Sequence, residues 1–423
     1  MEREIQRPIT IIDSEQYLID FLNETKERSA FDLKEIDFES QNQWNFSEGA
    51  LSHSSKGFFQ VVGVENTTGL NDQKLMLYQP QSALTGLIIS RQQNEIYVLL
   101  QARVEPGNTG VIQFGPTIQS TPANYLRLHG GKATAYIEYF TSFVPGCNLI
   151  THSMQHDLGS KYFQKSKTHH YLLSEDLIET KENMVWASLK AIKGVLLKEN
   201  FLNADLRSLL AVFDWDSLMM EDKKDRKKIE IDQPNNSTLG NYKMIPVDQL
   251  KNWSITKNGI SSLNPVLPTI GFFHFSATNR EVKAWSQPLY KLPNQGLIQL
   301  AYRVIGESLE FLIKKDHEWG ISTEFALYPT YISSPENPNS SKPITNGRLK
   351  RKIIQCDEGG RFFQNDSEYQ LIEINDFNLT DEFIWTSVDS LVFYLKQSNY
   401  CSFQLRCAAS VALDLLHPKA FGD

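Results

Sequence analysis

The sequence predicts an α+β protein built from two tandemly duplicated domains, each a mixed sheet of hairpins packed by helices. Residues 155–163 reappear as residues 355–363, with Gln, Asp, Gly and Phe at the same positions. Farther along, Trp186 returns as Trp385 at almost the same offset. An offset of about 200 residues is far longer than a solenoid unit of about 20–50 residues, so a duplicated domain is the simplest interpretation.

Shorter matches extend the repeat in both directions. The matched pairs are Gly57 with Gly271, Gln79-Pro80 with Gln287-Pro288, Gly86 with Gly296, Glu105 with Glu318, Pro116 with Pro329, and Arg207 with Arg406. These matches divide the chain into an N-terminal helix (1–30), a first repeat (31–216), a linker (217–241) and a second repeat (242–423).

The composition fits two globular domains. The chain has 423 residues, of which 41% are hydrophobic, which is enough for two cores of ordinary size. The net charge of −8 argues against nucleic acid as a partner, because a nucleic-acid-binding surface is basic. The basic run at 223–228 is interleaved with acids and is interpreted as a solvated part of the linker.

The four cysteines lack CxxC spacing, and two of them are replaced within the repeat: Cys356 aligns with His156 and Cys407 with Ser208. A disulfide framework or a zinc site is therefore disfavoured. The N-terminus lacks the apolar segment of a signal peptide, and no apolar run reaches the roughly 20 residues of a membrane span. These features predict a cytoplasmic protein without a membrane partner.

The expected elements follow in chain order. Asp13 and Gln16 form a capping-box pattern ahead of a helix whose apolar face carries Leu18 and Leu22. Residues 87–104 and 297–314 each read as two strands broken by a turn, and a further hairpin follows each of the motifs at 155–163 and 355–363. Each repeat closes with two apolar helices. Residues 333–345, rich in Pro, Asn and Ser, are expected to form a loop specific to the second repeat.

Familiar catalytic motifs are missing from the sequence. It contains no glycine-rich phosphate loop, no Gly-x-Ser-x-Gly elbow, no His-Glu-x-x-His helix and no carboxylate cluster suited to a metal. Any chemistry is therefore expected to be acid–base work without a metal or cofactor.

Four segments can carry such chemistry or can be purely structural. Alternation along a strand places Arg103 and Glu105 on one face, as substrate ligands or as a surface ion pair. Residues 115–131 are dense in hydrogen-bonding groups, which suits a ligand or a turn-rich connection. The aromatic residues of 155–163 are interpreted as core, whereas its Gln and Lys indicate a polar site. Arg207 and Arg406 lie in apolar helices and must be paired, with a carboxylate favoured over a ligand phosphate.

These segments resemble the nucleoside-diphosphate-hexose 2,3-dehydratases of deoxysugar biosynthesis. The resemblance covers about residues 30–415, including the duplication. The matching motifs are Gln79-Pro80, residues 105–108, residues 116–119, Asn124-Tyr125, Gln155 with residues 159–163, residues 287–289 and residues 357–362. The family's halves resemble Nudix-type α/β folds, so the resemblance implies two Nudix-like domains. The clustered glutamates of the Nudix box are missing here, which disfavours pyrophosphate hydrolysis.

The chain departs from the family in two ways. Where the family commonly reads Gln-Ser-Glu-Gln-Gly, this chain carries His156, Asp157 and Leu158 between its Gln and Gly. The second repeat also lacks counterparts of Asn124-Tyr125 and of residues 129–131. This asymmetry predicts that catalysis belongs to the first repeat.

The resemblance implies a dTDP-linked 4-keto-6-deoxyhexose as substrate, loss of water across C2 and C3 without a cofactor or metal, a homodimer, and a downstream 3-ketoreductase. The implied catalytic residues are Glu105 or His129 as base, Tyr125 as acid or enolate donor, and Lys161 as oxyanion or pyrophosphate donor. The implied nucleotide-sugar ligands are Trp44, Arg103, Asn108, Thr117, Gln119, Asn124, Arg127, Gln155, Trp285 and Arg361. The alternative is a non-catalytic nucleotide-sugar-binding or scaffold protein that has kept the duplicated fold.

Overall fold

The computed structural model describes residues 8–68, 72–128, 130–219, 234, 241–278, 280–333 and 342–422. Most of the expected linker and most of the expected loop at 333–345 lie outside these residues, as does His129. The described residues form two large sheets, two small sheets and short helices.

The first large sheet has eight strands, seven from the first repeat and β1 from the segment that precedes it. Its path is β1 (Ile11–Ile12), β14 (Met184–Ser188), β8 (Glu95–Val104), β7 (Ala83–Gln92), β13 (Ser166–Ser174) and β11 (Cys147–His156), with β10 (Ile118–Ser120) beside β7 and β9 (Ile112–Gly115) beside β8. β13 runs parallel to β7, whereas β7–β8 and β11–β13 are antiparallel pairs. The sheet is therefore mixed and built of hairpins, as predicted.

The second large sheet repeats this arrangement with seven strands. Its path is β22 (Ala326–Pro329), β21 (Ser308–Asp316), β20 (Gly296–Ile305), β25 (Asp366–Glu373) and β24 (Arg348–Cys356), with β23 (Tyr331–Ile332) beside β20 and β26 (Phe383–Ser387) beside β21. Thr117 and Thr330 play the same part in the two sheets, because each hydroxyl donates to a strand carbonyl and accepts from the amide of the neighbouring strand. The duplicated α+β fold is confirmed.

Two small sheets complete the repeats. The first consists of β12 (Tyr162–Phe163), β6 (Gln73–Tyr78), β5 (Gln60–Asn66), β4 (Ala50–His53) and β3 (Trp44–Ser47), with β15 (Tyr242–Ile245) beside β5. The second consists of β16 (Trp253–Thr256), β17 (Gly259–Ser262), β18 (Thr269–Ala277) and β19 (Ala284–Lys291), with β2 (Phe31–Ile36) beside β18.

The repeats exchange their opening strands. β2 lies in the first repeat of the sequence but pairs with β18, where Ile36 stands opposite Phe272. β15 opens the second repeat but pairs with β5, where Ile245 stands opposite Gly63. Each small sheet is thus extended by a strand from the other repeat. The same pairing makes Phe272 the counterpart of Gly63, so the match of Gly57 with Gly271 was wrong.

Two further sequence matches are out of register. Leu75 stands opposite Gly63 as Pro288 stands opposite Phe272, so Pro288 corresponds to Leu75 and its match with Pro80 was wrong. Lys167 pairs with Ala83 in the first large sheet, and its counterpart Ser367 pairs with Gly296 in the second. Gly296 therefore corresponds to Ala83 rather than to Gly86. A short Gly-Leu-Ile match carries little information in a buried strand, where apolar residues recur at many registers.

The helices are short apart from the first. α1 (Glu15–Arg28) is capped by Ser14, whose hydroxyl accepts from the amide of Tyr17, so the helix starts one residue later than the Asp13 pattern suggests. The other helices are α2 (Pro122–Tyr125), α3 (Ile137–Thr141), α4 (Leu189–Val195), α5 (Ala204–Val212), α6 (Asp216–Met219), α7 (Val388–Lys396), α8 (Phe403–Ser410), α9 (Leu413–Leu416) and α10 (Pro418–Phe421), together with the 3-10 turns η1 (Phe38–Ser40) and η3 (Val247–Gln249).

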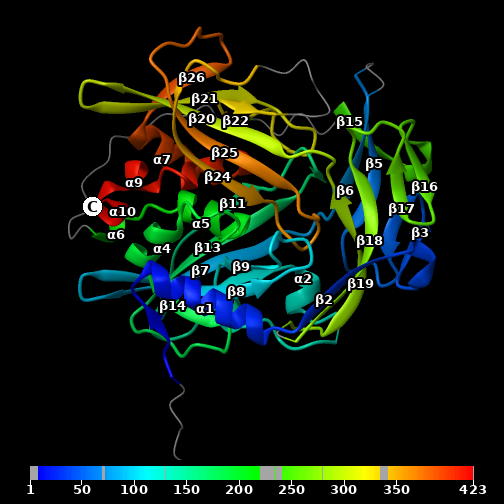
Figure 1. Ribbon diagram of the computed structural model, residues 1–423, viewed down its shortest axis with the longest axis horizontal. Helices are drawn as coiled ribbons and strands as arrows, with labels where there is room; N and C mark the ends of the chain where they lie inside the picture. Colours follow the sequence, from blue (N-terminus) through cyan, green and yellow to red (C-terminus); the bar gives the residue numbers. More distant parts are fainter. Residues whose placement is uncertain are drawn as a thin grey trace, which may run out of the picture.

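The large sheets lie one above the other with helices between them, and the small sheets form a layer beside them (Figure 1). Helices α5 and α8 pack against each other and are buried along their whole length. Two core clusters therefore meet at the contact between the repeats, and this contact positions the site described below.

The buried arginines of these helices bind across the contact. Arg207 of α5 donates from Nε to Oε1 of Gln355, and Arg406 of α8 donates from Nη1 to Oε1 of Gln155. Their other bonds go to hydroxyl and carbonyl oxygens, so the expected carboxylate partner was wrong. Uncharged acceptors suffice because several of them together satisfy the guanidinium donors. Burial lowers the pKa of Arg207 to about 10.

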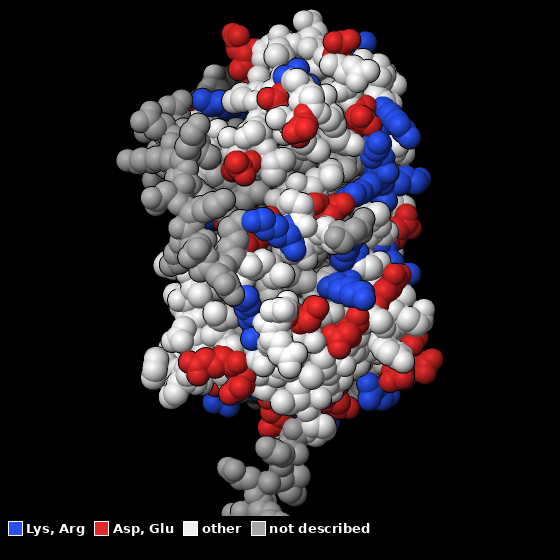
Figure 2. Space-filling model, turned by 90° about the vertical axis from the view of Figure 1, so that its left-hand side faces the viewer, with Lys and Arg blue, Asp and Glu red and all other residues white. Residues whose placement is uncertain are grey.

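On the face shown in Figure 2, basic and acidic side chains are interspersed over the described residues. Among the described residues, no helix has the length and apolar character that crossing a membrane requires.

Candidate functional site

The site arises where a turn of each repeat docks on a loop of the other. The Gly107 amide donates to the carbonyl of Gly359 over 2.7 Å, and the Gly320 amide donates to the carbonyl of Gly159 over 2.7 Å. A Cβ built on Gly107 would overlap the carbonyl oxygen of Phe362. Backbone therefore meets backbone at both junctions, which explains why both turns carry glycine.

A cavity of about 360 Å³ opens beside the first junction, and we call it the Glu105 cavity. Its described lining comes from the end of β8, the first small sheet, the α2 region, the connection from β18 to β19, the start of β19 and the 360–361 loop. The lining residues are Gln43, Trp44, His53, Ser55, Phe58, Phe59, Arg103, Glu105, Pro106, Thr121, Asn124, Leu128, Arg280, Glu281, Val282, Ala284, Trp285, Ser286, Gln287, Gly360 and Arg361. Both repeats therefore contribute to one cavity.

Six residues expected from the sequence meet in this cavity: Trp44, Arg103, Glu105, Asn124, Trp285 and Arg361. They come from positions spread over more than three hundred residues of the chain.

Glu105 and Arg103 form a buried pair rather than a surface one. Glu105 is 2% exposed, and its Oε1 accepts from Nε of Arg103 at 2.8 Å. Burial opposes the charge of Arg103, but the carboxylates of Glu105 and Glu281 outweigh it and raise the pKa of Arg103. The second oxygen, Oε2 of Glu105, is buried and has no hydrogen-bond partner among the described residues. An unsatisfied buried carboxylate oxygen is costly, so it marks a place where a ligand can supply the missing donor or proton.

The cavity is rich in cationic and aromatic groups. Arg103, Arg280 and Arg361 bring three guanidinium groups to its wall. Trp285 is half-buried, and its indole nitrogen donates to Oε1 of Gln287 at 2.7 Å. Trp44 is buried, and its indole nitrogen donates to the carbonyl of Ser286. Guanidinium groups suit a diphosphate, and an aromatic wall suits a nucleobase.

A buried charge network behind the cavity holds Arg361. Glu358 accepts from Arg361 at 3.0 Å, from the Tyr162 hydroxyl at 3.2 Å and from Lys167 at 3.2 Å. Lys167 also donates to Asp205 at 2.7 Å. Burial opposes the charge of Glu358, but the surrounding cations outweigh it and hold its pKa well below the usual range. Lys167 and the neighbouring buried Lys165 have no charged counterparts in the second repeat, where Ser367 and Asn365 replace them. This asymmetry was the signal in the sequence that could have revealed the network.

Several expected ligands instead stabilise the framework. Thr117 links two strands, Gln119 accepts from Asn203, and Gln155 binds Arg406. Asn108 packs directly against Gly359 at the docking junction. None of these four belongs to the described lining of the Glu105 cavity.

The remaining expected residues lie apart from the cavity or outside the described chain. Tyr125 ends α2, and the exposed Arg127 follows it with a positive φ of 57°. Neither lines the Glu105 cavity as described. His129 lies outside the described residues.

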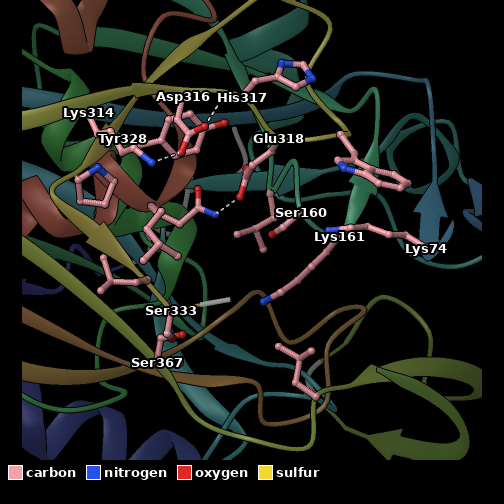
Figure 3. A pocket seen from close by; sticks show the side chains of 18 of the residues that line it. Lys74, Ser160, Lys161, Lys314, Asp316, His317, Glu318, Tyr328, Ser333 and Ser367 are labelled. Carbon is pink, nitrogen blue, oxygen red and sulfur yellow. Dashed lines mark hydrogen bonds and ion pairs between the residues drawn. The ribbon is translucent and has the colours of Figure 1, made fainter. Parts of the chain in front are cut away.

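Lys161 lines a second cavity of about 300 Å³ at the other junction, which we call the Glu318 cavity (Figure 3). There Glu318 accepts from Nε2 of Gln404 at 2.8 Å, and Lys161 forms an ion pair with Asp357. Burial raises the pKa of Glu318 to about 7. The position of Arg103 is taken by Asp316, which binds Lys314 at 2.7 Å. The two glutamates therefore correspond in sequence but differ in their electrostatic surroundings.

Two lining residues of the Glu105 cavity that could bind or act on a substrate were not predicted from the sequence. Arg280 follows β18 and donates from Nη1 to the carbonyl of Val104. His53 ends β4, and its ring lies against Trp44 and Phe58. Neither belongs to a repeated motif, so only the pairing of the small sheets brings them to the site. Among the described residues, no three His, Cys, Asp or Glu side chains gather where they could hold a metal ion.

The sequence of this chain is similar to a protein-family model and to three curated proteins. The family model described as NDP-hexose 2,3-dehydratase matches residues 15–213 and 231–411. Three curated relatives carry the description dTDP-4-dehydro-6-deoxy-alpha-D-glucopyranose 2,3-dehydratase. The relative from Saccharopolyspora spinosa is 25% identical over 89% of this chain and 87% of its own length. That from Amycolatopsis orientalis is 23% identical over 91% and 87%, and that from Streptomyces violaceoruber is 23% identical over 82% and 84%.

Solved structures give a weaker likeness. A Nudix hydrolase from M. smegmatis aligns with 28% of this chain and 82% of its own, at 12% identity and a TM-score of 0.19. An ADP compounds hydrolase aligns with 43% of this chain and 89% of its own, at 12% identity and a TM-score of 0.23. Scores this low support no argument, so the α+β duplication rests on the sheets themselves.

Proposed function

Because the chain belongs to the NDP-hexose 2,3-dehydratase family, we propose that it removes water across C2 and C3 of a dTDP-linked 4-keto-6-deoxyhexose. The product is a 3,4-diketo-2,6-dideoxy sugar nucleotide. The names of the three relatives support both the reaction and the dTDP-sugar. The observation that carries the proposal is the unpartnered Oε2 of Glu105 in a cavity lined by arginine and tryptophan.

The chemistry requires a base and a site for developing negative charge. The C4 ketone acidifies the C3 proton, because the electron pair released at C3 moves onto the ketone oxygen. Loss of the C2 hydroxyl then leaves a C2–C3 enol, which tautomerises to the 3,4-diketone. The substrate loses one water molecule and is neither oxidised nor reduced overall.

Glu105 is assigned as the base. Arg103 fixes its Oε1, which leaves Oε2 to take the C3 proton. Arg280 and Arg361 are assigned to the diphosphate and Trp285 to the nucleobase, since guanidinium groups pair with phosphate oxygens and an indole offers a flat apolar face. Tyr125, which follows the cavity residue Asn124 in α2, stays the candidate acid for the leaving hydroxyl, and His129 stays the alternative base. Lys161 belongs to the Glu318 cavity, so it has no role in this assignment.

One experiment separates the candidate functions. The protein is incubated with dTDP-4-keto-6-deoxyglucose with and without EDTA, and any diketo product is trapped with a 3-ketoreductase and NADPH. Loss of water that EDTA leaves unchanged supports the dehydratase. Binding without turnover supports the non-catalytic alternative, and release of nucleotide monophosphate that EDTA abolishes supports a Nudix-type hydrolase.

The proposal includes a homodimer and a 3-ketoreductase acting on the unstable product. Light scattering at micromolar concentration tests the dimer, and a monomer there would contradict it.

A further inference from the structure

We propose that His53 is a catalytic residue: a neutral imidazole whose Nε2–H donates a hydrogen bond to the C4 oxygen of the sugar as negative charge develops on it. This inference rests on the proposed function, since it assigns a role in that reaction.

The first step is the position of the ring. His53 ends β4 and lines the Glu105 cavity together with Trp44 and Phe58. Its ring meets the Trp44 ring edge to face at 5.4 Å and the Phe58 ring at 4.7 Å. These contacts fix the ring plane, so the imidazole is held in one orientation in the lining of the cavity that Glu105 also lines.

The second step is the tautomer. The backbone amide of Ser55 donates to Nδ1 of His53 at 3.2 Å, and the Ser55 hydroxyl lies 2.8 Å from the same nitrogen. A backbone amide can only donate, so Nδ1 must be an acceptor and the ring proton of the neutral imidazole is on Nε2. The Gly57 amide donates to the Ser55 hydroxyl at 3.3 Å, which turns the hydroxyl proton toward Nδ1.

A tight turn maintains this arrangement. The Lys56 amide donates to the carbonyl of His53 at 2.9 Å, and Lys56 has a φ of 52°. The turn folds Ser55 back over the ring. A proton on Nδ1 would face the hydrogen of the Ser55 amide, so the geometry favours the neutral ring. Burial also lowers the pKa of His53, in the same direction.

The third step is the chemistry that a neutral imidazole performs. When Glu105 removes the C3 proton, the C3–H bond breaks and its electron pair forms the C3–C4 double bond of an enolate. The negative charge then lies on the C4 oxygen, where a fixed N–H donor stabilises it. A neutral imidazole can act in this way while keeping its proton. His53 therefore neither gains nor loses a proton during the reaction.

The second repeat lacks this group. Trp44 pairs with His53 between β3 and β4, and Trp253 pairs with Ser262 between β16 and β17. Ser262 is therefore the counterpart of His53. The imidazole at this position is therefore specific to the first repeat, which agrees with the assignment of catalysis to the Glu105 cavity.

Two substitutions test the donor. His53→Phe keeps a flat ring against Trp44 but removes the N–H donor. His53→Gln keeps an N–H donor but replaces the ring with a flexible amide side chain. We expect His53→Phe to lower kcat by about 10² or more and to slow exchange of the C3 proton with D₂O. The affinity for dTDP, which lacks the keto sugar and therefore the proposed hydrogen bond, should stay within about two-fold. His53→Gln should recover at least about ten-fold of the lost kcat.

The outcomes separate this inference from the proposed function. A wild-type protein that binds the substrate without losing water contradicts the dehydratase itself. If the wild type turns over and His53→Phe stays within about three-fold of its kcat, only the role of His53 is overturned. That role is likewise overturned if His53→Phe loses dTDP affinity in proportion to kcat, or if His53→Gln is as slow as His53→Phe. Melting temperatures of both variants check that the fold is intact.

Discussion

At the scale of single residues, environment distinguishes two glutamates that the repeat makes equivalent. Glu105 is held by Arg103, whereas Glu318 is bound by the neutral amide of Gln404. At Glu318, burial without a guanidinium partner favours the acid form. At Glu105, Arg103 occupies one carboxylate oxygen and leaves the other available to take a proton, which suits a general base.

Replacing Glu105 with Gln should lower turnover by about 10² or more, because the amide keeps the size of the side chain but cannot take the C3 proton. Glu318→Gln is the matched control and should stay within a few-fold of wild type. Turnover is measured with C3-deuterated and unlabelled substrate, and a primary isotope effect should grow in the Glu105 variant. If Glu318→Gln abolishes turnover while Glu105→Gln does not, the catalytic cavity is the one at Glu318.

Glu318 should also make stability depend on pH. Burial raises its folded pKa to about 7, above the ordinary value of 4.5. Between these values the native state binds a proton that the unfolded state releases, so this group lowers stability as pH rises through the window. Glu318→Gln removes that dependence. The melting temperature of the variant relative to wild type should therefore increase from pH 5 to pH 8, and a difference independent of pH would contradict the buried neutral acid.

Arg207 and Arg406 should be structural. Lysine cannot reproduce the several directed bonds of a guanidinium, so Arg207→Lys should leave the buried acceptors on Gln355 and Leu196 unsatisfied. Calorimetry should show a lower melting temperature with dTDP affinity nearly unchanged, and Arg406→Lys should behave alike. Weaker dTDP binding at unchanged stability would instead make these arginines ligands of the diphosphate.

At the scale of elements, the sequence predicted which strands and helices form better than it predicted which residues share a cavity. Hairpins, closing helices and the pair Arg103–Glu105 follow from local alternation and periodicity. Trp44, Trp285 and Arg361 came from the family resemblance and do line the Glu105 cavity. His53 and Arg280 could not be predicted, because they reach the cavity through the pairing of distant strands. Thr117 and Gln155 were predicted as ligands, and the structure places both in buried hydrogen bonds, because such a framework uses the same residue types as a ligand site.

The docking turns should tolerate almost no side chain. Gly107→Ala would place a methyl group against the Phe362 carbonyl and force the repeats apart, so its melting temperature should fall sharply. Gly110→Ala is the control: its φ of +79° strains an alanine by roughly 1 kcal/mol, but no described atom lies within 4 Å of the added carbon. A Gly107 variant as stable as the Gly110 variant would contradict the close approach of the two loops.

At the scale of the whole molecule, the exchanged strands join the repeats into one folding unit. β2 extends the second small sheet and β15 the first, while Arg207 and Arg406 bind across the contact of α5 with α8. A half chain would expose the edge of β5 or β18, one glycine turn without its docking loop, and an apolar helix face. Exposed edges and apolar faces of this kind cause aggregation.

Residues 1–216 and residues 217–423 should therefore fail to fold when expressed separately, although each holds a complete repeat of the sequence. Produced together, they should associate, since each supplies the strand, turn and arginine that the other lacks. Circular dichroism and size-exclusion chromatography of each half and of the mixture provide the measurement. The mixture should elute as one complex with a cooperative melt and should bind dTDP, because the Glu105 cavity takes residues from both halves. A half that folds alone and melts near the intact protein would show that the exchanged strands are dispensable, and that the repeats are independent domains.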